Sequence, residues 1–339
     1  MDLFEPLLFG AFLGKPGWMW LAFIGIVVTL LVLDLGVLHR DNREIKVRES
    51  LLLSVGYIGL GLLFGAWVWW YLGAQPGMEY LTGFAVEKAL AMDNVFVIAM
   101  IFAFLAVPRV YQHRVLFWGI LGVIVLRAIM IGLGAAIVSE WSWVLYLFAV
   151  FLIATGIKML MFAETEYDVG SNPVLRFMKR CFNVVDEHHG ERFFVRLPDP
   201  KRPGRTTLFM TPLFVALALI EIADVIFAVD SVPAIFAITT DPFIVYTSNI
   251  FAILGLRALY FALAAMVHRF RYLKYALAVV LIFIGSKIFL ADLLGVDKLP
   301  ATLSLGGTFG TLAAGVLVSL FKTRMPQPAD DPRQGALRP

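Results

Sequence analysis

The stretch that decides the fold reads Glu221-Ile-Ala-Asp224-Val-Ile-Phe-Ala-Val-Asp230-Ser-Val-Pro233. Its three carboxylates lie inside an apolar run that extends from about residue 208 to about residue 238. A charged side chain at the centre of a bilayer costs roughly 2.5–3.5 kcal/mol on insertion scales, so each one calls for an explanation. A second apolar run, over residues 80–107, carries Glu87 and the triplet Met92-Asp93-Asn94. Two acidic clusters on two different spans indicate one shared site.

The composition of the chain is typical of an integral membrane protein. Of its 339 residues, 60% are hydrophobic and only 16% are charged, and the mean hydropathy is +0.84. Its apolar runs recur at lengths that can span a bilayer. The single cysteine, Cys181, excludes an intrachain disulfide framework. The first apolar run lacks both a basic leading segment and a small-residue cleavage site, so we expect a retained span and not a cleavable signal.

We predict an all-α, polytopic membrane helical bundle with about nine transmembrane helices. The predicted spans lie near residues 18–38, 51–72, 80–107, 115–138, 142–162, 208–238, 243–267, 274–294 and 302–321. Twenty-one Lys and Arg residues fall in the alternate connections on one side of these spans, and two fall on the other side. By the positive-inside rule, the N-terminus is expected outside the cell and the C-terminus in the cytoplasm.

The spans divide the chain into six parts. These are an N-terminal pair of helices in 1–72, a first three-helix repeat in 80–162, a cytoplasmic loop in 163–207, a second repeat in 208–294, a ninth helix in 302–321 and a tail in 322–339. In the loop, Asn172-Pro173 predicts the start of a helix that runs from Val174 to Val185, with apolar and basic residues interleaved. This helix either lies on anionic lipid or is a solvated linker. The Pro-rich, polar tail is predicted to be disordered.

An internal repeat relates the third to fifth spans to the sixth to eighth. Gly156-Ile-Lys158 matches Gly285-Ser-Lys287 at an offset of 129, and Leu126-Arg127-Ala128 matches Leu256-Arg257-Ala258 at an offset of 130. Each unit holds three spans, an odd number, so the second copy must enter the membrane from the opposite side. Two inverted three-helix repeats are a recurrent transporter architecture, with the substrate site near the bilayer midplane.

Charged residues lie inside the predicted spans. The acids are Asp34, Glu87, Asp93, Glu221, Asp224 and Asp230, and the bases are Lys88, Arg127, Lys158, Arg257 and Lys287. One interpretation is that they neutralise one another as buried ion pairs or serve as a relay. Arg127 and Arg257 lie centrally in their spans, where each could hold one carboxylate. Lys158 and Lys287 lie near opposite ends of theirs and could reach an interface.

The acids favour a second interpretation, a cation site, because they cluster. Glu221 and Asp224 lie about 60° apart on an ideal helix and share a face, where like charges repel unless a cation or proton sits between them. Asp93 and Asp230 would point elsewhere, so convergence needs a helix break, which Pro233 could supply. Oxygen donors suit Mn²⁺, Mg²⁺ or Ca²⁺. The predicted metal ligands are Glu87, Asp93, Asn94, Glu221, Asp224 and Asp230.

Enzyme motifs do not occur in this sequence. His-Glu-x-x-His, Walker A, Gly-x-Ser-x-Gly and paired Cys-x-x-Cys are all missing, so we expect no enzymatic activity, no permanently bound cofactor and no nucleic-acid partner. The polar cluster Asp186-Glu187-His188-His189 in the cytoplasmic loop is interpreted as a solvated loop in preference to a metal site.

The run from Glu221 through Asp241-Pro-Phe-Ile-Val-Tyr-Thr-Ser-Asn to Arg257 closely resembles the signature of the TerC family, and Glu87-Lys-Ala-Leu-Ala-Met-Asp-Asn-Val resembles its first-repeat counterpart. That family comprises bacterial inner-membrane proteins named for tellurium resistance. One branch, similar to the alkali-induced Alx protein, exports manganese, and the family is akin to the LysE-type exporters. The resemblance implies efflux of Mn²⁺ across the inner membrane through Glu87, Asp93, Glu221, Asp224 and Asp230.

The sequence therefore predicts a secondary transporter that exports a divalent metal cation, Mn²⁺, by alternating access. No nucleotide-binding motif is present, so an ion gradient or the membrane potential must drive it, and our hypothesis is that the carboxylates exchange protons for metal. One alternative is an exporter of an organic solute, as LysE kinship would allow. Another is a non-transporting scaffold of a tellurite-stress complex with 163–207 as its docking surface. The oligomeric state is left open.

Overall fold

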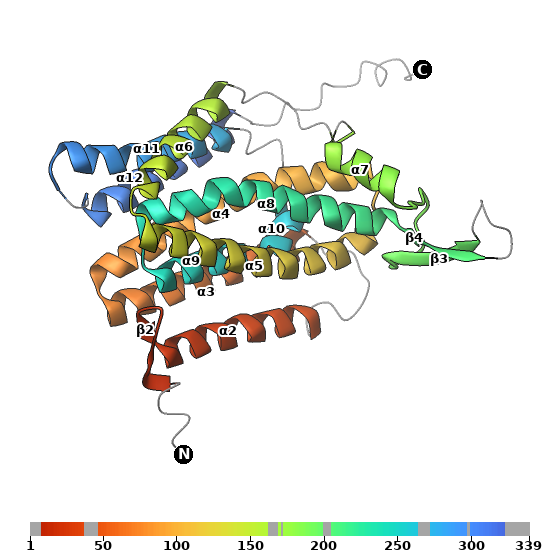
Figure 1. The fold of residues 1–339 in the computed structure, drawn as a ribbon, viewed down its shortest axis with the longest axis horizontal. Coiled ribbons are helices and arrows are strands. Elements are labelled where there is room, and N and C mark those ends of the chain that lie inside the picture. Colours follow the sequence, from red (N-terminus) through yellow and green to blue (C-terminus); the bar gives the residue numbers. More distant parts are fainter. Residues whose placement is uncertain are drawn as a thin grey trace, which may run out of the picture.

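A computed structural model places these segments in a bundle of long helices (Figure 1). It describes residues 8–36, 47–161, 169–170, 172–198, 205–263, 272–296 and 299–322. The elements in chain order are β1 (Ala11–Phe12), β2 (Lys15–Pro16), α2 (Gly17–Gly36), α3 (Val47–Leu72), α4 (Ala74–Phe104), α5 (Arg109–Glu140), α6 (Val144–Met161), α7 (Pro173–Cys181), β3 (Phe194–Pro198), β4 (Thr206–Met210), α8 (Pro212–Ile238), α9 (Pro242–Ile253), α10 (Leu256–Leu263), α11 (Leu273–Leu293) and α12 (Ala301–Lys322).

The helical membrane bundle predicted from the sequence is confirmed. Within the described residues, eight helical stretches are long and apolar enough to cross a membrane, and they coincide with eight of the nine predicted spans. The remaining predicted span, 80–107, is α4, which has 31 residues and carries Glu87, Lys88 and Asp93. α4 differs from the other eight in the charges that it carries and not in its length.

The interior position of α4 explains how it can carry charge. It packs against α3, α8, α9 and α12, so other helices shield it from lipid. The Tyr80 hydroxyl donates to the carbonyl of Gly61 on α3 at 3.0 Å, which ties the two helices together. Charged residues of membrane helices almost always face the bundle interior, because protein partners can replace water there.

The seventh predicted span, 243–267, is broken and not continuous. α9 ends at Ile253, the backbone of Leu254 leaves the helical region, and α10 begins at Leu256. Between them Gly255 has a φ of +81°, and a Cβ there would lie 2.6 Å from the Tyr57 side chain. Only glycine fits both the left-handed backbone and the close approach of Tyr57. The predicted span is present, and it consists of two shorter helices joined at Gly255.

The predicted helix break at Pro233 is also corrected. α8 runs without interruption from Pro212 to Ile238 and includes Pro233. A proline removes one backbone donor and clashes locally, yet in a membrane helix neighbouring helices can absorb the distortion. Within the described residues, the helical interruption in the bundle core lies at Gly255 and not at Pro233.

The crossing of α6 and α11 is reciprocal. A Cβ at Gly156 would lie 2.7 Å from the carbonyl oxygen of Ala278, and a Cβ at Gly285 would lie 2.7 Å from the carbonyl oxygen of Ala149. Both glycines and both alanines are separated by the same offset of 129 residues. A contact in which i meets j and j meets i is what a twofold axis generates. The inverted repeat itself remains a prediction, which this contact favours.

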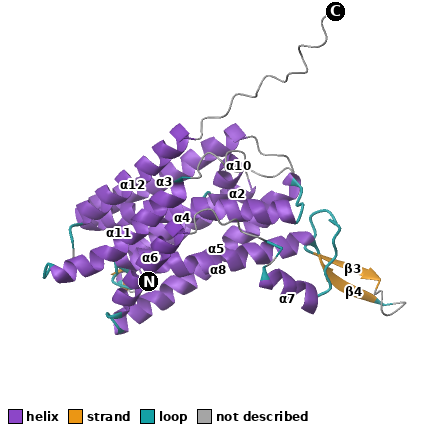
Figure 2. Ribbon diagram, turned by 90° about the horizontal axis from the view of Figure 1, so that it is seen from above, coloured by secondary structure: helices purple, strands orange, loops and turns teal. Residues whose placement is uncertain are grey.

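Two non-membrane elements lie at one end of the bundle, α7 and the antiparallel hairpin β3–β4 (Figure 2). The Asn172 side chain accepts from the Val174 amide at 2.8 Å, so the helix starts where the sequence predicts. It ends at Cys181 and not at Val185, because the Asn183 carbonyl and the Val185 amide pair with Met210. The rest of the predicted loop (162–168, 171 and 199–204) and the predicted tail after Lys322 lie outside the described residues.

If α7 lay on lipid, its apolar residues would all be expected to face the membrane, but part of them pack against the bundle instead. Leu175 and Met178 are buried against the bundle, whereas Phe177 and Phe182 are exposed. The apolar residues of α7 are thus divided between the protein interior and the surface.

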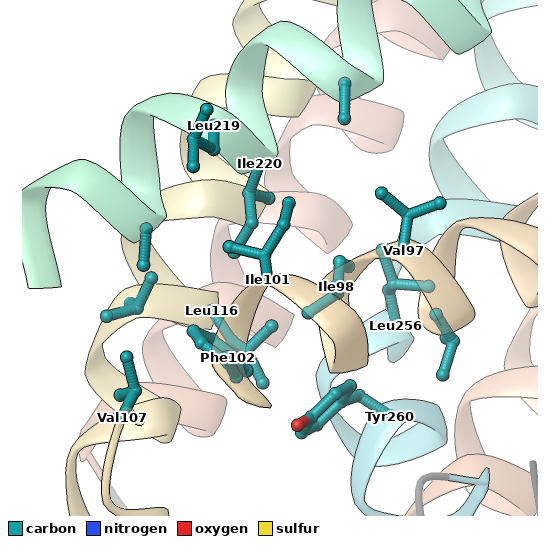
Figure 3. Close-up of a cluster of buried hydrophobic side chains, with 14 of the residues drawn as sticks. Val97, Ile98, Ile101, Phe102, Val107, Leu116, Leu219, Ile220, Leu256 and Tyr260 are labelled. Carbon is teal, nitrogen blue, oxygen red and sulfur yellow. The ribbon is translucent and has the colours of Figure 1, made fainter. Parts of the chain in front are cut away.

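Two hydrophobic clusters occupy successive levels of the bundle. The hairpin-side cluster (Figure 3) includes Ile98, Ile101, Phe102, Leu116, Leu219, Ile220, Leu256 and Tyr260, from α4, α5, α8 and α10. The far-side cluster includes Val86, Leu90, Ile131, Val232, Ile235, Phe236, Leu281 and Ile284. Figure 1 shows the hairpin at one end of the long axis and the α11–α12 turn at the other. The charged residues described next lie between the two clusters.

Candidate cation site

Arg127, on α5, is the centre of the polar core. Its guanidinium forms ion pairs with Glu87 on α4 and with Asp224 on α8, the second at 3.3 Å. It also donates to Ser231 Oγ at 3.0 Å and to Asn249 Oδ1 at 3.2 Å. The exposed fraction of Arg127 is 1%. One buried cation therefore joins three helices of the two predicted repeats.

Asn249, on the broken segment, completes the shell around Glu87. Its side-chain amide donates to Glu87 Oε2 at 3.0 Å while its carbonyl accepts from Arg127. Both Glu87 oxygens are thereby held, one by a guanidinium and one by an amide. Asn249 and Ser231 were not among the predicted site residues. The signal for Asn249 was the polar triplet Thr247-Ser248-Asn249 inside an apolar span.

The second carboxylate of the core is not fully satisfied. Within the described residues, Asp224 Oδ2 is buried and has no hydrogen-bond partner, and the same holds for Glu221 Oε2 one turn earlier on α8. Burying a carboxylate costs several kcal/mol unless its oxygens are compensated. One helix face of α8 thus carries two buried carboxylate oxygens that have no donor among the described residues.

A small cavity lies beside Asp224. Its volume is about 20 Å³, and its lining includes Asn94, Gly119, Ile220 and Asp224. A single water needs roughly 10–15 Å³ by this kind of measure, so the space admits one particle the size of a water or a metal ion. Asn94 brings an amide oxygen from α4, and its exposed fraction is 5%. Oxygen donors from α4 and α8 thus face the same small space.

Gly122, on α5, has no side chain and so leaves room for the Glu221 carboxylate. A Cβ at Gly122 would collide with the carboxylate oxygens of Glu221. Glu221 therefore lies against the backbone of α5, the helix that carries Arg127. The side chain that packs closely against Gly122 is thus a charged one.

The other two predicted carboxylates lie apart from this core. Asp230 accepts a hydrogen bond from Thr155 of α6 at 3.1 Å, near Lys158. Asp93 lies on α4, within electrostatic range of Lys274 on α11. Among the described residues, no three His, Cys, Asp or Glu side chains are grouped closely enough to hold a metal ion. The structure brings Glu87 and Asp224 to Arg127 and places Glu221 against Gly122 on the same helix as Arg127, and it does not bring Asp93 and Asp230 to them.

The remaining predicted charges have separate partners. Arg257, the first-turn residue of α10, forms an ion pair with Asp34 of α2 at 2.5 Å and also donates to the Asp34 carbonyl. Lys88 donates to the carbonyl of Ala252 at 3.0 Å. Lys287 donates to Ser304 of α12. Lys158 is exposed on α6. Asp34 is thus placed in a buried pair that fastens the broken segment to α2.

The polar loop cluster is tied to the bundle by its side chains. Glu191 forms an ion pair with Arg114 of α5 at 2.7 Å, and His188 Nε2 lies 3.1 Å from the carbonyl oxygen of Ala106. These contacts anchor the hairpin base to the α4–α5 turn.

Comparison with known proteins relates most of the chain to one family. Residues 72–327 match the family model described as "Integral membrane protein TerC family". A membrane protein of Rickettsia bellii, named as uncharacterized, is 46% identical over 303 residues, which is 89% of this chain and 97% of that protein. The "Putative membrane-bound redox modulator Alx" of Escherichia coli K12 is 43% identical over 312 residues, 89% of this chain and 94% of its own. No solved structure matches the chain.

Proposed function

Because the chain belongs to the TerC family of integral membrane proteins, we propose that it is a secondary transporter that exports a divalent metal cation, Mn²⁺, from the cytoplasm. The observation that carries this proposal is the pair of buried carboxylate oxygens, Asp224 Oδ2 and Glu221 Oε2, that have no hydrogen-bond partner in the described part of the chain. Asp224 and Asn94 both line the cavity of about 20 Å³. A hard cation in that cavity would compensate the free oxygens.

The charge of the core supports a divalent cargo. Glu87, Asp224 and Glu221 carry three negative charges when ionised, and Arg127 carries one positive charge. The net charge of these four side chains is therefore −2, which one divalent cation neutralises. Two protons would neutralise it equally, so an exchange of one cation for two protons leaves the charge inside the membrane constant. This balance is the physical reason for proposing protons as the coupling ion.

The donor types support a hard metal. Carboxylate and amide oxygens are preferred by Mn²⁺, Mg²⁺ and Ca²⁺, whereas soft thiolate ligands select Cu⁺ and Zn²⁺. The choice of Mn²⁺ within the hard class rests on the family resemblance. Among the lining residues, one acid, Asp224, and one amide side chain, Asn94, bring oxygen donors to the cavity, with Glu221 one turn away on α8. Such a small ligand set suits a transporter because tight binding would prevent release.

The arrangement of the bundle supports alternating access. The charged core lies between the hairpin-side and far-side clusters, so apolar side chains separate it from both faces. The reciprocal α6–α11 crossing supports a twofold relation between the repeats, and repeats of this kind can rock about a fixed midplane site. We propose that the hairpin end faces the cytoplasm of the bacterial inner membrane, because the basic residues are concentrated there.

Uptake of ⁵⁴Mn²⁺ into inside-out membrane vesicles tests the function. Vesicles with the wild type are expected to accumulate the isotope when acidified inside. Asp224→Asn is expected to lower the initial rate at least about tenfold, because a charge-assisted ligand contact is lost. Asp186→Asn, a matched change at an exposed loop carboxylate, should transport like the wild type.

Each outcome of this experiment separates the alternatives. If wild-type vesicles take up no more isotope than empty ones, metal export is wrong, and an organic-solute exporter or a scaffold takes its place. If Asp224→Asn transports as fast as the wild type, the site assignment is wrong. Glu221→Gln provides a second variant should Asp224→Asn fail to fold, because Glu221 has no ion pair with Arg127 among the described contacts.

A further inference from the structure

A large cavity opens at the end of the bundle opposite the hairpin. Its volume is about 410 Å³, far above the roughly 10–15 Å³ that one water requires. The walls come from α4, the start of α6, the end of α8, α11, the start of α12 and the turns beside them. The polar residues that matter here are Glu79, Thr82, Thr239, Lys287, Asp292 and Ser304. We call this space the far-end cavity.

The floor and the mouth of the far-end cavity differ in chemistry. Thr82, Thr239 and Ser304 are almost completely buried, with exposed fractions of 0%, 2% and 2%. Lys287 donates to Ser304 and adds a positive charge at this level. Asp292 is exposed and Glu79 is partly exposed, with the Gln75 amide donating to the Glu79 carboxylate at 3.2 Å. The carboxylates are thus the more accessible groups, and hydroxyls with one ammonium lie deeper.

The far-end cavity approaches the polar core along two helices. On α4, Thr82 precedes Glu87 by five residues, which is roughly 7.5 Å of helix rise. On α8, Phe236 follows Ser231 by the same number of residues. Side chains of the far-side cluster, Phe236 among them, fill the intervening layer. One apolar layer therefore separates the cavity from the Arg127 network.

We propose that the far-end cavity is an outer vestibule in which the exported ion is held as a hydrated divalent cation. This inference rests on the proposed function. Small divalent cations give up their water reluctantly, and a cavity of this size leaves room for a hydration shell. Glu79 and Asp292 attract the ion to the mouth, and Lys287 repels it from the floor. The ion is thereby kept from returning through the apolar layer.

Lys287 distinguishes this vestibule from a simple acidic surface. Without a positive charge at the floor, the hydroxyl groups of Thr82 and Ser304 would be attractive ligands for the cation. With Lys287 present, binding at the floor is opposed by like charge. We therefore expect weak, fast exchange at the mouth, a property that favours release on the outer side.

Thiol labelling tests the vestibule independently of transport. In a Cys181→Ser background, which removes the chain's one cysteine, Thr82→Cys places a thiol in the cavity. Thr247→Cys is the matched control, because Thr247 is equally buried but lies on α9 away from the cavity lining. A membrane-impermeant thiol reagent, added to right-side-out vesicles, should modify Thr82→Cys at least about tenfold faster, since water-filled space reaches only that position.

The occupant is identified by protection from labelling. Mn²⁺ outside the vesicles should slow the modification of Thr82→Cys, and the Mn²⁺ concentration for half protection should rise about tenfold in the Glu79→Gln/Asp292→Asn variant. Lys287→Met should lower that concentration, whereas Glu140→Gln, an exposed carboxylate outside the lining, should not change it. Equal labelling of Thr82→Cys and Thr247→Cys would overturn the open vestibule. Protection by phosphate instead of Mn²⁺ would overturn the cation and favour an anion at Lys287.

Two separate measurements distinguish failure of the vestibule proposal from failure of the metal-export proposal. The labelled variants can be assayed for ⁵⁴Mn²⁺ uptake in inside-out vesicles before modification. Uptake without Mn²⁺ protection refutes the vestibule and leaves the export function standing. Loss of uptake in the wild type refutes the export function whatever the labelling shows.

Discussion

Replacing Arg127 by Met measures what the guanidinium contributes to the polar core. Arg127 compensates Glu87 and Asp224, which have exposed fractions of 3% and 5%. Removing one partner of a buried ion pair costs roughly 3–5 kcal/mol, because the other charge stays buried and uncompensated. Here two carboxylates lose the same cation. We therefore expect the free energy of unfolding to fall by at least about 3 kcal/mol in a metal-free solution.

The assay is reversible unfolding by SDS in mixed micelles with a chelator present. The control is the triple variant Arg127→Met/Glu87→Gln/Asp224→Asn, which removes the charges while keeping the shapes. It is expected to regain most of the lost stability, because no uncompensated charge remains. Mn²⁺ at one hundred times its Kd should add about 2.7 kcal/mol to a protein that binds it only when folded. That gain should be present in Arg127→Met and missing in the triple variant.

Two results would refute the reasoning about Arg127. The first is an Arg127→Met protein as stable as the wild type in chelator, which would mean that the carboxylates are neutral or solvated. The second is a triple variant as unstable as the single one, which would mean that the loss arises from packing and not from charge.

Two further variants test other parts of the fold by the same titration. Gly285→Ala should lower the free energy of unfolding by about 1–3 kcal/mol, since its Cβ would meet the Ala149 carbonyl, whereas Gly310→Ala has open space and should be neutral or stabilising. Equal effects would contradict the close α6–α11 crossing. Asp34→Asn should cost about 3 kcal/mol because it removes the carboxylate that pairs with the buried Arg257, and an unchanged stability would contradict the buried pair.

Apolar run length predicted the membrane bundle well, because a segment that crosses lipid must be long and apolar. The break at Gly255 escaped prediction because the run remains apolar on both sides of it. Only the φ of +81° and the proximity of Tyr57 show why a glycine stands there. Pro233 misled in the opposite direction, because the loss of one backbone hydrogen bond did not interrupt α8.

In the polar core, the sequence predicted which residues share a helix face but not which residues of different helices meet. The sequence indicated that Glu221 and Asp224 share a face and that Arg127 could hold a carboxylate. It could not tell which carboxylates Arg127 holds, because that depends on how α4, α5 and α8 pack. Asn249 was missed for the same reason, since its role follows from its distance to Glu87 and not from its position in α9.

The separation of Asp93 and Asp230 from the core has a physical cause as well. On uninterrupted helices, residues six or nine positions from Glu87 and Glu221 leave the shared face, and both α4 and α8 are uninterrupted. A role for Asp93 or Asp230 in cation movement would therefore need another conformation or a separate step. The metal-ligand assignment of these two residues remains a prediction.

Anomalous scattering at the manganese absorption edge tests the central claim most directly. A structure of the protein prepared with Mn²⁺ is predicted to show one anomalous peak in the cavity between Asn94 and α8, within coordination distance of Asp224 Oδ2 and Glu221 Oε2. The peak should vanish in Asp224→Asn. A protein that transports Mn²⁺ but shows its membrane-depth peak elsewhere, such as beside Asp93 or Asp230, would contradict the account.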